Sequence, residues 1–208
     1  MAGKFEGTVK KKKKWPWILG ICLVLVAAAA LYYFYFYQGD SGKPTLIVET
    51  PQKLSVSQAE EFTLDVTVSD LGEVRYPAMS MSVSFDSSRL EFLGVEEGNI
   101  FILSDENTTG QQLPDWSCNT QNSNDIGLIN IMYLDLTGGR NAFSRDLLSD
   151  DYNVVLRLKF RLRGSARPGD VLDLIVEDAV FAASDENDSL AMTTNTLRVK
   201  NGRLVIGE

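Results

Sequence analysis

Alternation of apolar and polar residues dominates the chain from residue 44 to residue 207. Over residues 62–69, 78–85 and 154–163 every second side chain is apolar, which is the period of a half-buried strand. Shorter strand-like segments lie at 46–49, 90–95, 116–120, 128–136, 171–176, 197–200 and 203–206. Many short strands with one apolar face each predict an all-β, two-sheet sandwich.

Turn residues separate these segments. Asn201-Gly202 fits a two-residue type I′ hairpin between the last two strands. Residues 140–151 are the one stretch where we expect a short helix or flap. Residues 128–136 are apolar on both faces, so both faces of that strand are expected to be covered.

An uninterrupted apolar segment precedes the alternating region. Residues 18–37 contain no charge, and as a helix they would span roughly 30 Å, the thickness of a bilayer core. Lysines at residues 10–14 come directly before it, so the positive-inside rule places the N-terminus in the cytoplasm. The rival interpretation is a cleaved signal peptide with its cleavage site at residues 27–29.

These observations predict a single-pass protein of the cell membrane. We expect a short basic cytoplasmic tail over residues 1–17, a transmembrane signal anchor over residues 18–37 and a linker over residues 38–43. One extracytoplasmic β-sandwich domain then occupies residues 44–207.

Composition excludes several classes of function. The chain has no His, which removes Ser-His and Cys-His nucleophile pairs and His-containing zinc sites. Residues 41–208 hold 14 basic and 26 acidic side chains, which argues against nucleic acid as a partner. Cys22 falls within the predicted anchor and Cys118 in the outer domain, so the two cannot pair within one chain. We predict neither an enzyme nor a cofactor.

Three groups of charged residues could form either a functional site or ordinary solvated surface. Sugar hydrolysis needs two carboxylates that face each other across the substrate. The candidates are Asp115, Asp135, Asp150 and Asp151, and their spacing does not indicate that any two of them face each other. A plain acidic turn is favoured over a calcium site at Asp185, Glu186 and Asp188. A solvated strand face is favoured over polymer or lipid contact for the basic stripe Arg157, Lys159, Arg161 and Arg163.

Several segments, in order, resemble a known family. PTLIVETPQKLSVSQAEEFTLDVTVSD (44–70) has a strand, spacer and strand, and an aromatic-Asp-x-x-x-Leu-Glu turn runs from Phe85 to Glu91. GLINIMYLDLTGG (127–139), the tract at residues 154–190 and NGRLVI (201–206) follow. Together they resemble the cohesin domain, the module of cellulosome scaffoldins that binds dockerins.

The resemblance implies a nine-stranded jelly-roll sandwich that binds a helical, calcium-loaded dockerin through one sheet face. Carried over by register, the partner-binding residues on the third strand are Ala78, Ser80 and Ser82, with Ser84 beyond them. On the fifth strand they are Asp115 and Ser117, with Asn119. On the sixth strand and in the late loop they are Asn130, Met132, Leu134, Asp135 and Leu190. Small Ala and Ser stand where charged or amide side chains are frequent in the family.

Two other functions share the sandwich fold. A carbohydrate-binding module would need exposed aromatic rings to stack on sugars. Here the aromatic residues fall mostly on inward positions, and Trp116 is the one strong candidate in the outer domain. The second alternative is a structural envelope protein with no dockerin partner.

Overall fold

The structure is a computed structural model that describes residues 23–32, 43–55, 61–72, 74–100, 116–139, 141–183 and 191–208. The chain separates into two compact units, Met1–Gly42 and Lys43–Glu208. Residues 23–32 of the first unit are helical. Within the described ranges, no helix combines the length and the apolar character needed to cross a membrane. The other residues of the predicted anchor, 18–22 and 33–37, lie outside the described part.

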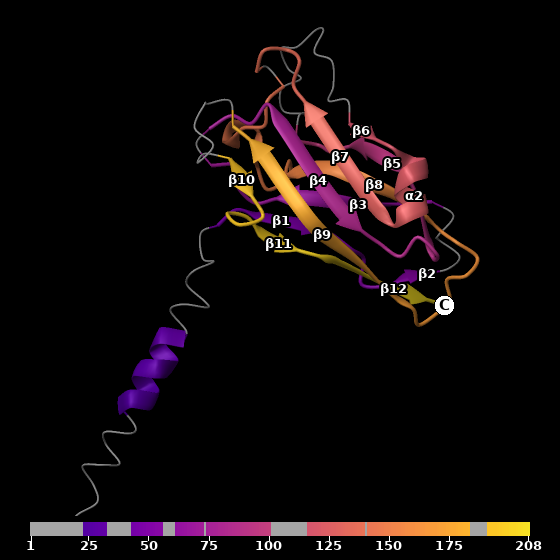
Figure 1. Cartoon of the computed structure of the whole chain (residues 1–208), viewed down its shortest axis with the longest axis horizontal. Helices are drawn as coiled ribbons and strands as arrows, with labels where there is room; N and C mark the ends of the chain where they lie inside the picture. Colours follow the sequence, from indigo (N-terminus) through magenta and orange to yellow (C-terminus); the bar gives the residue numbers. More distant parts are fainter. Residues whose placement is uncertain are drawn as a thin grey trace, which may run out of the picture. The chain divides into compact units, whose positions relative to one another are not determined.

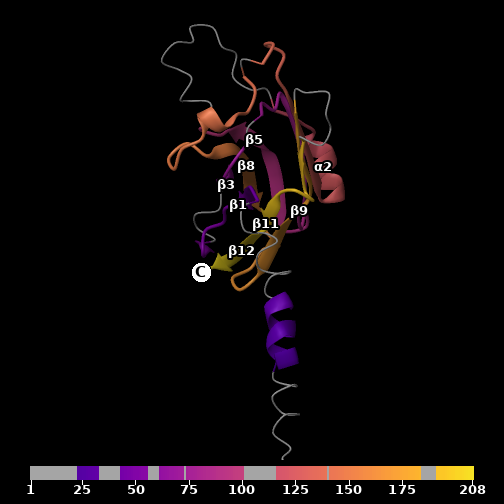
Figure 2. The same cartoon turned by 90° about the vertical axis from the view of Figure 1, so that its left-hand side faces the viewer.

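The second unit is a sandwich of two sheets, as predicted (Figures 1 and 2). The first sheet has the order β11 (Arg198–Lys200), β1 (Thr45–Val48), β3 (Phe62–Val68), β8 (Val154–Leu162) and β5 (Leu90–Glu97). The second has the order β2 (Leu54–Ser55), β12 (Gly202–Gly207), β9 (Val171–Ala182), β4 (Ala78–Ser84), β7 (Leu128–Leu134) and β6 (Ser117–Cys118), and β10 (Met192–Thr193) pairs with β9.

The strand count differs from the nine expected. The described residues contain 12 strands, and three of them, β2, β6 and β10, have only two residues each. β6 falls within the expected segment 116–120, whereas β2 and β10 fall in none of the expected segments. A two-residue strand is too short to show the alternation of apolar and polar residues, which needs at least four residues.

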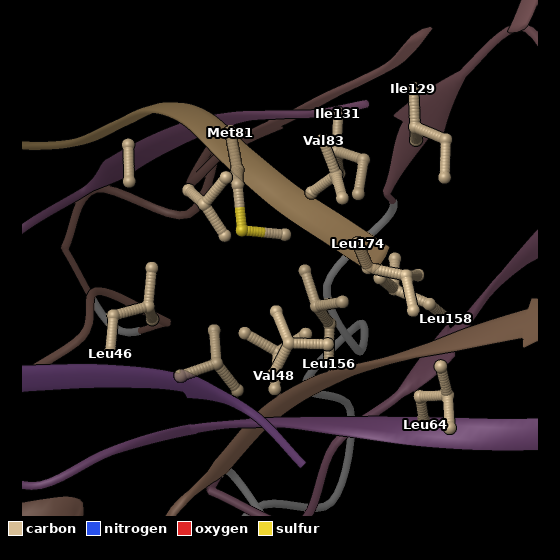
Figure 3. Close-up of a cluster of buried hydrophobic side chains, with 14 of the residues drawn as sticks. Leu46, Val48, Leu64, Met81, Val83, Ile129, Ile131, Leu156, Leu158 and Leu174 are labelled. Carbon is tan, nitrogen blue, oxygen red and sulfur yellow. The ribbon is translucent and has the colours of Figure 1, made fainter. Parts of the chain in front are cut away.

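The core lies between the sheets and follows the predicted alternation. On β4 the buried side chains are Met79, Met81 and Val83. Met81 and Val83 lie across the core from Leu156 and Leu158 of β8 (Figure 3). Each of these side chains is nearly inaccessible to solvent. Burial of this continuous apolar layer drives the two sheets together.

Aromatic rings fill one part of this core. Phe160 on β8 is fully buried, and its ring centroid lies 5.6 Å from those of Phe85 and Phe92 and 6.1 Å from that of Phe62. The predicted inward positions on β4 and β8 are therefore confirmed. Phe62, Phe85, Phe92 and Phe160 are core or core-packed residues and do not offer a row of rings to a sugar.

One helix of the sandwich was not predicted. This helix is α2 (Thr120–Ile126). Asn119 caps its N-terminus, where the side-chain oxygen accepts a hydrogen bond from Asn122 N at 3.0 Å. Gly127 ends the helix with φ of 69°, a left-handed conformation that glycine adopts without strain. A short 3₁₀ helix, Arg145–Leu147, lies in the stretch where a helix or flap was expected.

Asn124 of α2 joins the two sheets. Its side-chain oxygen accepts from Phe92 N and its side-chain nitrogen donates to Phe92 O, both at 2.8 Å. The amide group thus pairs with β5 of the first sheet, while α2 leads directly into β7 of the second. Asn124 therefore ties the segment before β7 to β5 of the other sheet.

The predicted hairpin at Asn201-Gly202 is wrong. β11 pairs with β1 in the first sheet, whereas β12 pairs with β9 in the second. Neither turn residue has the positive φ that a type I′ turn requires. A Cβ on Gly202 would lie 2.9 Å from Val48 Cγ1, so glycine is needed here for close packing where the chain crosses between sheets.

The basic stripe of β8 is a solvated, ion-paired face, as favoured. Arg157 Nε lies 3.0 Å from Asp65 Oδ1, and Lys159 Nζ lies 2.9 Å from Glu61 Oε2. Arg161 Nη2 lies 2.8 Å from Glu61 Oε1. Glu96 and Glu91 of β5 also lie near Lys159 and Arg161. Because acids on β3, just before it and on β5 match these cations, the outer surface of the first sheet presents no concentrated positive charge there.

Candidate interaction face

Strands β9, β4 and β7 lie next to one another in the second sheet (Figure 1), and their register aligns side chains in rows across it. Ser80 of β4 is paired with Val180 on one side and with Met132 on the other. Ser82 is paired with Asp178 and with Asn130 in the same way. Strand alternation turns these side chains away from the core, so the rows form one continuous surface.

Apolar side chains are exposed along β7 and just beyond it. Met132 is 56% exposed, Leu134 is 54% exposed and Leu136 is 85% exposed. We call these three residues the apolar stripe. The inward face of β7 is covered as expected, but its outward face is left in solvent. Large exposed apolar side chains gathered in one place are typical of an interaction surface.

A shallow hollow lies beside the apolar stripe. Its volume is about 390 Å³, and it is lined by residues of β4, β7 and the β6 region: Ser80, Met81, Ser82, Ser117, Cys118, Asn119, Asn130, Ile131 and Met132. Ser82 Oγ donates to Asn130 Oδ1 at 2.8 Å across its floor. The hollow therefore gathers five of the ten residues predicted to bind a partner, Ser80, Ser82, Ser117, Asn130 and Met132, together with Asn119, which was named beside them.

Ala78 and Leu134 continue the same face at its apolar end, where they are paired with each other across β4 and β7. Asp115 and Leu190, the remaining two predicted contacts besides Asp135, lie outside the described residues. So do the acidic residues at 185–188. The described residues alone thus bring seven of the ten predicted positions onto one face.

Asp135 has a different environment from the other predicted contacts. Its Oδ1 accepts from Thr137 N at 2.7 Å and from Thr137 Oγ1. Burial, the largest single influence, acts to raise the pKa of Asp135, but hydrogen bonds from Thr137, Gly139 and Asn141 together outweigh it and lower that pKa. The carboxylate of Asp135 therefore accepts hydrogen bonds within its own turn.

Cys118 lines the hollow but has the properties of a structural thiol. Burial raises its pKa, which disfavours the reactive thiolate at neutral pH. Its neighbour Trp116 packs on the aromatic core, with its ring centroid 5.3 Å from that of Tyr133. Among the described residues, no three acidic or thiol side chains come together as a metal site.

Comparison with known proteins identifies the fold. The cohesin domain model matches residues 48–200. No protein with a curated description matches the chain. The cohesin of OlpA, solved in complex with the dockerin Doc918 from Clostridium thermocellum, has a TM-score of 0.58 at 18% identity, over 79% of this chain and 99% of that chain.

Two further solved structures are similar. The third cohesin of ScaC from Acetivibrio cellulolyticus, in complex with the ScaB dockerin, has a TM-score of 0.56 at 12% identity and covers 79% of this chain and 99% of that chain. A non-cellulosomal cohesin from the archaeon Archaeoglobus fulgidus has a TM-score of 0.50 at 15% identity, over 80% and 93% of the two chains. The family match spans most of the sandwich, and this chain belongs to the cohesin domain family.

Proposed function

We propose that this chain is a non-catalytic interaction module that binds dockerin-bearing proteins through the outward face of β4, β6 and β7. The observation that supports the proposal is the apolar stripe, which leaves Met132 and Leu134 in solvent beside a row of short side chains on β4. Burial of such residues against a partner is favourable, and the chain belongs to a family whose solved relatives include cohesin–dockerin complexes.

Direct capture tests this function. The full-length chain, purified in mild detergent and immobilised, is titrated with dockerin modules encoded by the same genome. Binding is expected with calcium and is expected to disappear with a chelator, because the dockerin's own calcium loops are needed for its folding. If no dockerin binds and the chain retains cellulose or another glycan, the carbohydrate-binding function replaces this one.

We propose further that residues 18–37 anchor the module in the cell membrane with the sandwich on the extracytoplasmic side. The support is the apolar, charge-free segment and the lysines before it. The protein is then expected to stay with membranes through a high-salt wash and to leave only with detergent. Protease added to intact wall-stripped cells should remove the sandwich. A soluble form that begins near residue 30 would show that the segment is cleaved.

A further inference from the structure

The methionines of the sandwich differ sharply in their exposure to solvent. Met79 and Met81 are each 1% exposed and Met192 is 6% exposed, whereas Met132 is 56% exposed. The three buried methionines belong to the core between the sheets, and Met132 lies on the outward face of β7. The chain has five methionines, and the fifth, Met1, lies outside the described residues. An oxidant dissolved in water therefore reaches one of these four thioethers directly.

Hydroxyl groups flank Met132 on both sides. The register pairs Met132 with Ser80 of β4 and with Ser117 of β6, and both serines are exposed. Directly paired residues of neighbouring strands have Cβ atoms about 5 Å apart, so either hydroxyl can donate to a polar atom on the Met132 side chain. A thioether sulfur is only a weak acceptor, whereas a sulfoxide is polar. The surroundings of Met132 thus suit its oxidised form.

Oxidation at this position would change the chemistry of the apolar stripe. Met132, Ser80 and Ser117 all line the shallow hollow. A sulfoxide oxygen that accepts from Ser80 or Ser117 would hold the side chain against this polar surface. The apolar stripe would then lose the member that lies beside the hollow and keep only Leu134 and Leu136. Conversion of a flexible apolar side chain into a polar one disrupts interfaces that depend on methionine.

The other sulfur atom of the hollow reacts less readily. Cys118 lines the hollow next to Ser117. Burial raises the pKa of the Cys118 thiol, so the thiolate, which is the form that oxidants attack, is disfavoured at neutral pH. Met132 needs no deprotonation before it reacts. The thioether of Met132 is therefore the accessible reducing group of the hollow.

We propose that Met132 is a reversible oxidation site that switches the outward face off for its partner. This inference rests on the proposed function and names a regulation of the same face. A peroxide transfers one oxygen atom to the Met132 sulfur: the O–O bond breaks, an S–O bond forms, and the second oxygen of hydrogen peroxide leaves as water. The sulfur loses two electrons and the peroxide gains them. Methionine sulfoxide reductases restore the thioether. In the proposed complex Met132 is covered, so oxidation acts on modules that hold no partner.

Peptide mass mapping tests the site of oxidation without any dockerin. The full-length chain in mild detergent is treated with dilute hydrogen peroxide, and the gain of one oxygen atom at each methionine is followed with time. Met132 is expected to react about ten-fold faster, or more, than Met79, Met81 and Met192, whose oxidation requires the sandwich to open. In urea, where burial is lost, the four rates should become similar. Equal rates in the folded chain, or faster oxidation of a buried methionine, would overturn the inference.

Dockerin capture then measures the switch. The oxidised chain is freed of peroxide before the dockerin is added, so that the partner itself is not oxidised. Capture is expected to weaken about ten-fold and to recover after treatment with the reductases. The matched control is Met132→Leu, which has no thioether at this position and should have the same affinity before and after peroxide treatment.

The untreated chain separates this inference from the proposed function. If it captures no dockerin, the proposed function fails and the switch fails with it, while the mass mapping still decides the site of oxidation. If the untreated chain captures a dockerin and the oxidised chain captures it equally well, only the switch is overturned. A loss of affinity in peroxide-treated Met132→Leu as large as that of the unmodified chain would overturn it as well.

Discussion

Met132→Asp is expected to abolish dockerin capture while the domain stays folded. Met132 is 56% exposed in the chain alone, so an aspartate there is solvated and the free energy of unfolding should change little. In the complex the same position would be buried, and an unpaired carboxylate would lose its hydration. We expect the dissociation constant to rise about a hundred-fold or more, as measured by isothermal titration calorimetry, with an unchanged far-UV circular dichroism spectrum.

A second disruptive variant and a control variant accompany Met132→Asp. Ser80→Arg introduces a long charged side chain into the hollow and should have the same effect as Met132→Asp. Arg161→Ser removes a charge from the other sheet, where Arg161 pairs with Glu61, and should leave capture unchanged. Equal binding by Met132→Asp and the unmodified chain would show that the partner, if any, uses another surface.

Phe160→Ala is expected to destabilise the sandwich by about 3–5 kcal/mol. The side chain is fully buried, and its ring meets those of Phe62, Phe85 and Phe92, so truncation leaves a cavity that neighbouring rings cannot close. A loss of this size threatens a domain of ordinary stability. Urea denaturation followed by tryptophan fluorescence gives the free energy of unfolding.

Ser82→Ala is the matched control for the core prediction. Ser82 lies on the outward face of β4, where its hydroxyl donates to Asn130 Oδ1 in an exposed position. Its loss should change the free energy of unfolding by less than about 0.5 kcal/mol. If Phe160→Ala and Ser82→Ala lower the free energy of unfolding by the same amount, the assignment of Phe160 to the core and of Ser82 to the outward face is wrong.

The family resemblance selected the strands of the candidate face, and alternation along β4 and β7 was enough to predict which of their side chains point outward. Alternation separates the buried Met81 and Val83 from the outward-pointing Ser80 and Ser82, because successive side chains of a strand point to opposite faces of the sheet. The exposure of Met132 was likewise foreseeable once its neighbours Ile131 and Tyr133 were assigned to the core. These assignments depend only on local periodicity.

Other features depend on long-range contacts that periodicity does not encode. The segment that forms α2 is polar and lacks an apolar stripe, so only its caps, Asn119 and Gly127, signalled a helix. Asn201-Gly202 has the composition of a hairpin, but packing of Gly202 against Val48 directs the chain into the other sheet. The carboxylate of Asp135, a predicted partner contact, also accepts a hydrogen bond from Thr137 in its own turn, which the strand pattern does not reveal.

The Asn124–Phe92 pairing also bears on how copies of this protein behave when they are crowded together. β5 is the last strand of its sheet, and an unpaired edge strand is a template for aggregation with another chain. The amide of Asn124 occupies both free backbone groups of Phe92, and Val95 N further along donates to the Cys118 thiol. Side chains, and not a further strand, therefore occupy these backbone groups of the edge strand. Neighbouring copies held at high local density would therefore find no open backbone at Phe92 of β5 with which to extend this sheet.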